Sequence, residues 1–283
     1  MNKKLSSLVA ALALPAALMA QGWPANHQGV MLQGFYWNSF DASHWKNLES
    51  QADELAQYFN LVWIPQSGNC GGESMGYDDL YWFNNYQSAF GSEQELRSMI
   101  GKLKQKGTGT IADVVINHRK TLTNWVDFPK ETYQGKTYQL LSTDICKDDC
   151  GGQTASWAAA NGYALSNNND TGEGVTFARD LDHNSANVQK NVKAYLHFLL
   201  NDMGYAGVRY DMVKGYAAKF TALYNADAKP TFSVGEYFDG NKQLLTNWIN
   251  GTKVHGVIQS AAFDFNTRYA VRDATNYSNW TKL

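Results

Sequence analysis

Within residues 207–216, an arginine and an aspartate stand two positions apart at the end of an apolar run, and a lysine follows. In an extended strand, residues i and i+2 point to the same face, so Arg209 and Asp211 share one side of it. A neighbouring cation keeps an aspartate ionised at neutral pH, and an ionised aspartate can act as a nucleophile. A buried structural ion pair produces the same R-x-D pattern, so this run alone leaves both readings open.

Two further apolar runs also end in polar side chains. Residues 231–236 end in Glu236, and residues 110–118 end in Asn117 and His118. Strands of this kind, separated by helical patterns, indicate one end of a parallel α/β barrel, where active sites are built. Two carboxylates from neighbouring strands suit glycoside hydrolysis, which needs a nucleophile or base and a general acid.

Four motifs in this order resemble those of the α-amylase family of glycoside hydrolases, most nearly its plant-type members. The motifs are DVVINH at 113–118, DLDH at 180–183, GVRYDMVKGY at 207–216 and VGE at 234–236. The segment GYDDLY at 76–81 is similar to a family segment that follows the second strand. The resemblance covers roughly residues 28 to 270, and its strength lies in the ordered set of motifs.

The resemblance implies a retaining endo-hydrolase of α-1,4-glucans, with starch or malto-oligosaccharides as substrate. Asp211 is then the nucleophile, and Glu236 first protonates the leaving oxygen and later deprotonates water. Arg209 holds Asp211 ionised, whereas Glu236 needs a raised pKa. The resemblance also implies three more substrate-binding residues, which are Tyr77, His118 and Lys214. As isolated residues, each of these has a structural alternative, such as a solvated surface charge for the lysine.

Calcium is implied as well, because the plant-type pattern brings hard oxygen ligands together from separated places. The implied ligands are the side chains of Asn117, Asp170 and Asp180 and the carbonyl groups of Glu173 and Gly215. Asp113 matches a structural aspartate inside the family's barrel, and we assign no chemistry to it.

The alternation of strand and helix patterns along the chain predicts an incomplete TIM-type (β/α)8 barrel. Six strands are predicted, at residues 30–37, 61–65 and 110–118, before Asp211, before Glu236, and at 260–265. The polar, Gly- and Asn-rich stretch 119–178 is too long for an ordinary connection, so we expect an inserted calcium-binding loop domain there. The first part of the barrel then covers 21–118 and the second part 179–283.

The family motif N-H-D, which supplies a third catalytic carboxylate after the seventh strand, is not found in the sequence. We therefore expect this chain to be the first part of a longer α-amylase, with little activity on its own. Two alternatives stay open. One is a carbohydrate-binding relative without catalysis, and the other is an α-glucan transglycosylase that uses the same residues.

Composition limits the remaining possibilities. The 283 residues, 44% of them hydrophobic, suit one barrel domain with a large core. A formal net charge of −2 indicates no nucleic-acid partner and no charged membrane surface. We expect a monomer.

The N-terminus has the pattern of an export signal. Lys3 and Lys4 precede an apolar stretch from Leu5 to Leu18, and small residues surround Ala20. A membrane helix is the alternative, but the stretch is shorter than the roughly 20 residues that a span needs. We predict a signal peptide over residues 1–20, secretion or periplasmic residence, and no membrane association after cleavage.

Three cysteines remain in the predicted mature chain. Export permits a disulfide between two of them, and the odd count leaves one over. A zinc site is less favoured, because no C-x-x-C or H-x-x-x-H motif accompanies them.

Overall fold

The computed structural model describes residues 27–278 and 280–282, so the predicted signal peptide lies outside the described residues. A single curled sheet of six parallel strands forms the centre of the molecule, and the strands are ordered as they follow in the chain. They are β1 (Met31–Gln33), β2 (Leu61–Ile64), β3 (Gly109–Val114), β8 (Gly207–Tyr210), β9 (Phe232–Gly235) and β12 (Ala261–Ala262). The sheet confirms the predicted incomplete barrel. Within the described residues, β1 and β12 each have a neighbour on one side only.

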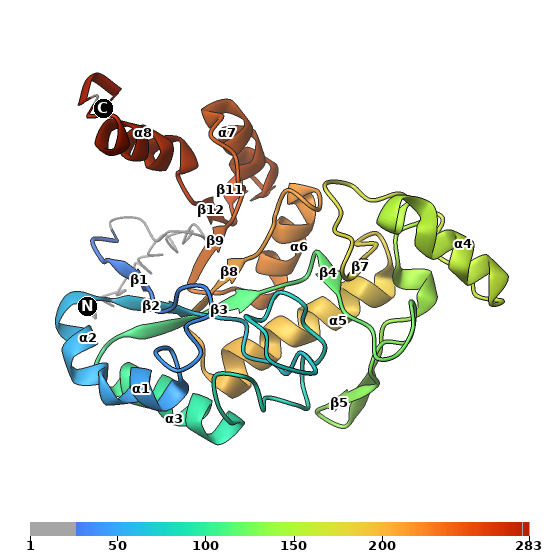
Figure 1. Cartoon of the computed structure of the whole chain (residues 1–283), viewed down its shortest axis with the longest axis horizontal. Helices are drawn as coiled ribbons and strands as arrows, with labels where there is room; N and C mark the ends of the chain where they lie inside the picture. Colours follow the sequence, from blue (N-terminus) through green and yellow to red (C-terminus); the bar gives the residue numbers. More distant parts are fainter. Residues whose placement is uncertain (1–26, 279, 283) are drawn as a thin grey trace, which may run out of the picture.

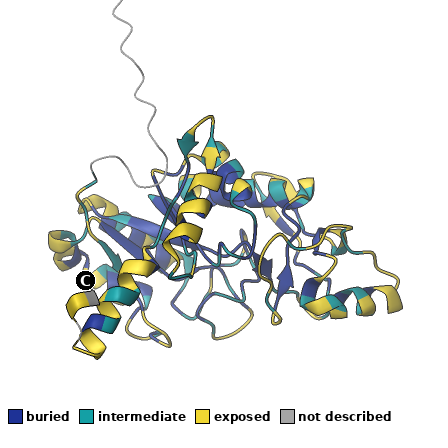
Figure 2. Ribbon diagram, turned by 90° about the horizontal axis from the view of Figure 1, so that it is seen from above, coloured by how far each residue is buried: buried dark blue, intermediate teal, exposed yellow. Residues whose placement is uncertain are grey.

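Helices cover the outer face of this sheet (Figure 1). They are α1 (Trp45–Ser50), α2 (Ala52–Tyr58), α3 (Glu93–Gln105), α5 (Ala186–His197), α6 (Ala218–Ala228) and α7 (Lys242–Gly251). Helix α8 (Phe265–Asn276) follows β12 and extends away from the sheet (Figure 1). Every residue of β2, β8 and β9 is buried, as expected for parallel strands covered on both faces. Figure 2 shows the same division, with buried strands at the centre and exposed residues on the outer sides of the helices.

The end signals of two helices act as the sequence predicts. Ser92 and Glu95 form the capping box that starts α3, and Gly107 follows its end with φ +86°. Helix α5 continues as a π-helical stretch, Phe198–Met203, and stops at Gly204, where φ is +87°. Both glycines adopt the left-handed conformation that other residues avoid.

Several predicted boundaries are wrong. The apolar residues from Trp45 to Phe59 follow helical spacing and predict one helix, but this helix is interrupted at Gln51, so α1 and α2 are separate. The first and sixth strands are shorter than predicted, because the chain leaves the sheet after Gln33 and after Ala262. The third strand stops at Val114, and residues 118–119 instead pair with the inserted segment.

The inserted segment begins and ends at one antiparallel pair, β4 (His118–Arg119) with β7 (Arg179–Asp180). It contains a hairpin of β5 (Glu131–Tyr133) and β6 (Lys136–Tyr138), two short 3-10 turns (Ser142–Asp144 and Asp149–Gly152), and helix α4 (Gln153–Ala160). Arg119 anchors the hairpin to the barrel through a fully buried ion pair with Glu131, at 2.5 Å. The pairing of β4 with β7 places Asn117 and Asp180 next to each other, at the junction between insert and barrel.

Three small elements complete the described chain. They are the hairpin strands β10 (Lys253–Val254) and β11 (Val257–Ile258) and a final 3-10 turn at Trp280–Lys282. Over residues 27–278 and 280–282, no helix has the length and apolar character needed to cross a bilayer.

Candidate active site

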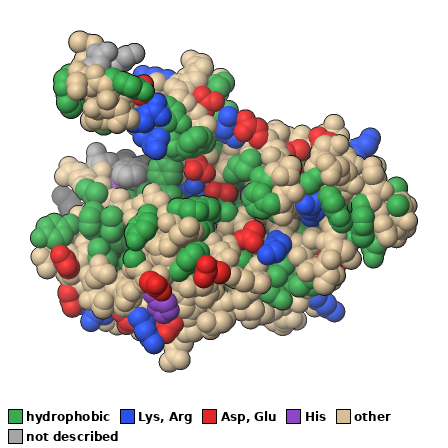
Figure 3. Space-filling view, in the orientation of Figure 1, with side chains coloured by type: hydrophobic (Ala, Val, Ile, Leu, Met, Phe, Trp, Pro, Cys, Tyr) green, Lys and Arg blue, Asp and Glu red, His purple; other side chains and the backbone are tan. Residues whose placement is uncertain are grey.

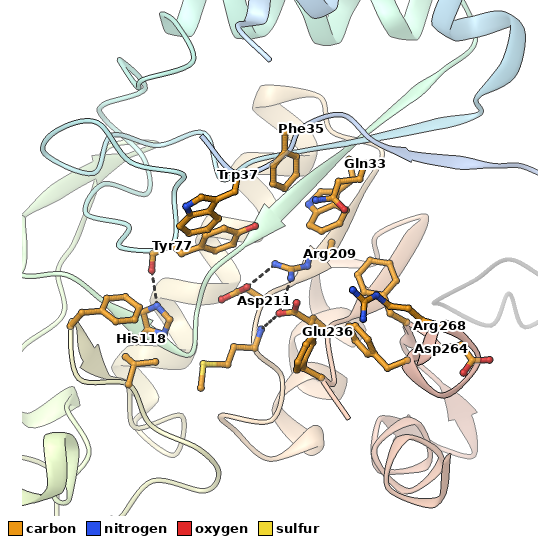
Figure 4. Close-up of a pocket in the computed structure, with 17 residues that line it drawn as sticks. Gln33, Phe35, Trp37, Tyr77, His118, Arg209, Asp211, Glu236, Asp264 and Arg268 are labelled. Atoms are coloured by element: carbon orange, nitrogen blue, oxygen red, sulfur yellow. Dashed lines mark hydrogen bonds and ion pairs between the residues drawn. The ribbon is translucent and has the colours of Figure 1, made fainter. Parts of the chain in front are cut away.

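A cavity of about 740 Å³ opens at the carboxyl ends of the sheet strands. Its lining includes five residues that the sequence singles out: Tyr77, His118, Arg209, Asp211 and Glu236. Figure 4 shows these side chains converging from separate segments of the chain. Carboxyl ends of parallel strands meet at one edge of a barrel, so residues far apart in sequence share one site.

Arg209 is the centre of this site. One of its terminal nitrogens, Nη1, lies 2.5 Å from Asp113 Oδ1 and 2.7 Å from Asp211 Oδ1, and the other, Nη2, lies 2.8 Å from Glu236 Oε2. The arginine side chain is 2% exposed, whereas that of Glu236 is 26% exposed and faces the cavity. A single guanidinium therefore binds three carboxyl groups, which arrive on β3, just after β8 and just after β9.

Burial raises the pKa of Glu236 above its ordinary value, the charge of Arg209 opposes this rise, and the charge of Asp211 adds to it. Burial also raises the pKa of Asp113 to about 7, again against the effect of Arg209. One positive charge does not compensate three negative ones in a dry site. The arrangement thus favours a proton on part of this cluster near neutral pH.

Asp113 orders two of the aromatic walls. Its Oδ2 atom accepts hydrogen bonds from Trp63 Nε1 at 3.0 Å and from the Tyr77 hydroxyl at 3.1 Å. The ring of Trp37 stacks in parallel on Tyr77, with a centroid distance of 6.1 Å. Through these contacts, a buried carboxylate fixes flat aromatic surfaces beside the two carboxyl groups that face the cavity.

His118 is held as a neutral side chain. Burial lowers its pKa, and its Nε2 atom lies 2.8 Å from the Tyr77 carbonyl oxygen, so Nε2 carries the hydrogen. The edge of this ring meets Phe177 of the inserted segment at a centroid distance of 5.1 Å. The insert therefore supplies part of the cavity wall next to His118 (Figure 4).

Lys214 does not line this cavity. Its ammonium group lies 2.8 Å from Glu173 Oε1 and 3.4 Å from Asp239 Oδ2. The lysine thus links the inserted segment to the loop after β9, and its substrate contact stays a prediction.

The predicted calcium ligands lie close to one another where the insert joins the barrel. Asn117 Nδ2 is 3.5 Å from Asp180 Oδ1, and a side chain at Gly215 would collide with the Asn117 amide. A side chain at Gly174 would collide with Asp180 and contact Asp170 Oδ2 at 3.7 Å. The two aspartates also line a cavity of about 270 Å³.

The electrostatics of this cluster fit a cation. Asp170 Oδ2 is buried and has no hydrogen-bond partner among the described residues. Burial raises the pKa of Asp180 to about 8 and, to a smaller extent, raises that of Asp170, and nearby carboxylates add to both effects. Carboxylate, amide and carbonyl oxygens are the ligands that calcium prefers.

Neither a zinc site nor a disulfide is present in the part of the chain that the structure describes. Its residues contain no group of three or more His, Cys, Asp and Glu side chains arranged to hold a metal ion, so a cation site there must also use amide and carbonyl oxygens. All three cysteines, Cys70, Cys146 and Cys150, are free thiols, and the first two are buried.

Sequence reasoning missed several cavity residues, which are Trp37, Phe177, Phe238, Phe263 and Arg268. Three of these aromatic residues follow a sheet strand within four positions: β1 before Trp37, β9 before Phe238 and β12 before Phe263. Their position just after a strand could have indicated that these residues line the site, since side chains just beyond the carboxyl end of a barrel strand point toward it. Phe177 lies in the insert and gave no such signal.

The strand-end carboxylates and the aromatic cavity define the active-site architecture of an α/β-barrel glycosidase. The model of the family "Alpha amylase, catalytic domain" matches residues 72–243, more than half of the chain. The chain belongs to the α-amylase family.

Relatives agree with this assignment. The chain is 31% identical over 267 residues to "Probable alpha-amylase 2" of Arabidopsis thaliana, a match that covers 89% of this chain and 60% of that protein. It is 26% identical to "Glucan 1,4-alpha-maltotetraohydrolase" of Roseateles saccharophilus, over 90% of this chain and 47% of that one. This chain therefore spans about half to three-fifths of the length of these relatives.

Solved structures show the same fold. The α-amylase of Malbranchea cinnamomea superposes with a TM-score of 0.58 at 18% identity, over 86% of this chain and 51% of that one. The α-amylase of Geobacillus thermoleovorans, solved with acarbose, gives 0.57 at 16% identity and the same coverage.

Proposed function

We propose that this site hydrolyses α-1,4-glucosidic bonds within starch-like polysaccharides and retains the configuration of the anomeric carbon. The observation that carries the proposal is the shared guanidinium of Arg209, which binds Asp211 and Glu236 from adjacent parallel strands. Retaining glycosidases need two carboxyl groups on either side of the scissile bond, about 5 to 5.5 Å apart. Family membership supports the same chemistry.

Asp211 is the nucleophile in this proposal. Its carboxylate attacks the anomeric carbon, a covalent ester forms, and the bond to the glycosidic oxygen breaks. Glu236 donates its proton to that departing oxygen, then takes a proton from the water that cleaves the ester. The raised pKa of Glu236 suits the first of these steps, because an acid must hold its proton at working pH.

The surrounding residues bind and orient the sugar. Tyr77 offers a flat ring, fixed by its hydroxyl bond to Asp113, for stacking on the sugar beside the scissile bond. Neutral His118 offers hydrogen bonding without adding charge to the site. Lys214 reaches substrate in this proposal only by leaving its bonds to Glu173 and Asp239.

Calcium is proposed at the junction of insert and barrel. The Asn117 amide, the carboxylates of Asp170 and Asp180, and the carbonyls of Glu173 and Gly215 would hold it. When bound, the ion supplies charge compensation to the acidic cluster and joins the insert to the barrel. The insert carries Phe177, so a firmly held insert keeps the cavity wall beside His118 in place.

Export to the periplasm or the medium remains part of the proposal, and it rests on the N-terminal pattern alone. It agrees with a polymeric substrate, which does not cross membranes. Fusing residues 1–30 to a reporter enzyme and measuring its export, with Lys3 and Lys4 replaced by Glu as a control, tests it.

The proposed reaction is tested by following the cleavage of maltoheptaose by the full-length enzyme with NMR. We expect the α-anomer to appear first and then to mutarotate, with internal bonds cleaved early. Appearance of the β-anomer first would refute retention. Products longer than the substrate at high sugar concentration would instead favour transglycosylation, and binding without cleavage would favour a non-catalytic relative.

A further inference from the structure

Helix α4 of the insert ends in a Schellman motif that folds the chain back on the helix. The Tyr163 N–H donates to the Ala158 carbonyl at 2.9 Å, and the Gly162 N–H donates to the Ala159 carbonyl at 3.4 Å. Gly162 adopts φ +76°, the left-handed conformation that this turn requires. The backbone of Tyr163 is thereby fixed beside the last turn of the helix.

This turn places two aromatic rings together on the surface. The rings of Trp157 and Tyr163 stack with a centroid distance of 5.8 Å and an interplanar angle of 16°. Tyr163 is 46% exposed, and Trp157 is partly buried against the core. Neither residue lines the catalytic cavity, and α4 lies at the far end of the insert (Figure 1). Figure 3 shows hydrophobic side chains on the surface at that end of the molecule.

The segment around these rings carries no formal charge. Residues 151–169 contain no Asp, Glu, Lys or Arg, although such residues make up 18% of the chain. The segment is instead rich in amide and hydroxyl side chains, and Asn161, Asn167 and Asn169 are exposed. A flat apolar ring surrounded by neutral hydrogen-bonding groups suits an uncharged polyhydroxylated ligand better than a polyanion or an anionic membrane.

We propose that Trp157 and Tyr163 form a second carbohydrate-binding site, a surface platform for α-glucan chains separate from the catalytic cavity. The identity of the glucan rests on the proposed function. Tyr163 presents the free ring face, Trp157 supports it from behind, and the helix end holds both in place before binding. Such preorganisation reduces the entropy that binding costs. The platform would hold an insoluble or long substrate near the cavity without contributing to the chemical step.

Granular starch and the full chain provide the test. Only protein that soluble maltodextrin releases from washed granules is counted, so aggregates that merely sediment are excluded. Tyr163→Leu keeps the apolar contact of the Schellman motif but removes the flat ring, and we expect about fivefold to tenfold less captured protein. Tyr163→Phe keeps the ring and should be captured like wild type. Hydrolysis of a short soluble oligosaccharide should be the same in all three.

Tyr58→Ala is the matched control, because Tyr58 is another exposed tyrosine, 66% exposed, on the distant helix α2. Capture of Tyr163→Leu at the wild-type level would overturn the platform and assign the ring pair to helix stability alone. Equal losses in Tyr163→Leu and Tyr58→Ala would overturn it too. A full-length enzyme that hydrolyses oligosaccharide but is not captured refutes only this inference, whereas a full-length enzyme that does neither refutes the proposed function as well.

Discussion

One acidic cluster lies in the barrel and a second lies at the junction between barrel and insert, and their charges are compensated in different ways. In the barrel, Asp113, Asp211 and Glu236 share the buried guanidinium of Arg209. At the junction, Asp170 and Asp180 lie close to each other, and neither forms an ion pair with a basic side chain among the described residues. The Oδ2 atom of Asp170 also has no hydrogen-bond partner among these residues.

If calcium binds as proposed, the protein relies on its own charge in the barrel and on a ligand at the junction. A cation built into a strand remains in place through every catalytic cycle, which suits a nucleophile that must stay ionised. A cluster that needs an external ion can instead make the insert's attachment depend on that ion. The barrel site should therefore respond mainly to substitution, and the junction mainly to metal.

The largest expected effect comes from Asp211→Asn in the full-length enzyme. The proposed nucleophile is lost with almost no change in volume, so the rate of glycosidic cleavage should fall by at least about a thousandfold while the fold persists. Steady-state kinetics and circular dichroism measure the two properties side by side. Near wild-type hydrolysis by this variant would remove Asp211 from the chemistry.

Arg209→Met removes the internal cation and leaves three carboxyl groups without compensation. Removing one partner from a buried charge cluster typically costs about 3 to 5 kcal/mol, so the free energy of unfolding of this variant should be lower than that of the wild type by about this amount. Arg268→Met is the matched control, since this arginine borders the same cavity but is exposed on α8. Equal stability of the two variants in urea unfolding would contradict the central place of Arg209.

Chelation should act on the junction. An ion that binds only the native state stabilises it by mass action, by about 2.7 kcal/mol at a hundredfold excess over Kd, so a chelator should lower Tm. Asp170→Asn should abolish most of this response, and Asp53→Asn, an exposed aspartate on α2, should leave it intact. A melting curve that excess chelator does not change would contradict calcium binding at the junction.

A further expected effect is a pH dependence of stability. The pKa of Asp113 is raised to about 7 and that of Asp180 to about 8, both chiefly by burial, so the native state holds protons that the unfolded chain releases near pH 4. Without metal, stability should therefore fall as pH rises from about 4 to about 8.

Calcium should reduce this slope, because the ion favours the ionised form of Asp180 and leaves Asp113 unchanged. Thermal melts across this pH range, with chelator and with calcium, give the comparison. A slope of the opposite sign in chelator, or the same slope with calcium, would contradict the assignment of these two groups.

The sequence predicts that Arg209, Asp211 and Glu236 lie together, because parallel topology brings strand ends to one edge of the sheet. Motifs at residues 113–118, 207–216 and 234–236 had to meet at one edge once their strands were recognised, and the family resemblance supplied their order. The insert was also recognisable from its length and composition. Its boundaries as a domain, and its role in binding calcium, stay predictions.

Other features depend on register, which the sequence does not reveal. Asp113 and Arg209 are direct partners across β3 and β8, so Asp113 belongs to the charge cluster rather than to the barrel interior alone. Helix breaks such as that at Gln51 depend on how each helix fits the sheet. The engagement of Lys214 by Glu173 depends on how the insert folds back, and no spacing along the chain predicts it.

The most direct test of the central claim is to trap the covalent intermediate and locate it by mass spectrometry. A fluorinated α-maltosyl fluoride carries a leaving group that departs without an acid, and its second fluorine slows hydrolysis of the ester. The account predicts a maltosyl adduct on the peptide containing Asp211, absent from the Asp211→Asn variant and still formed in Glu236→Gln. An adduct on Glu236, or no adduct in the wild-type full-length enzyme, would contradict it.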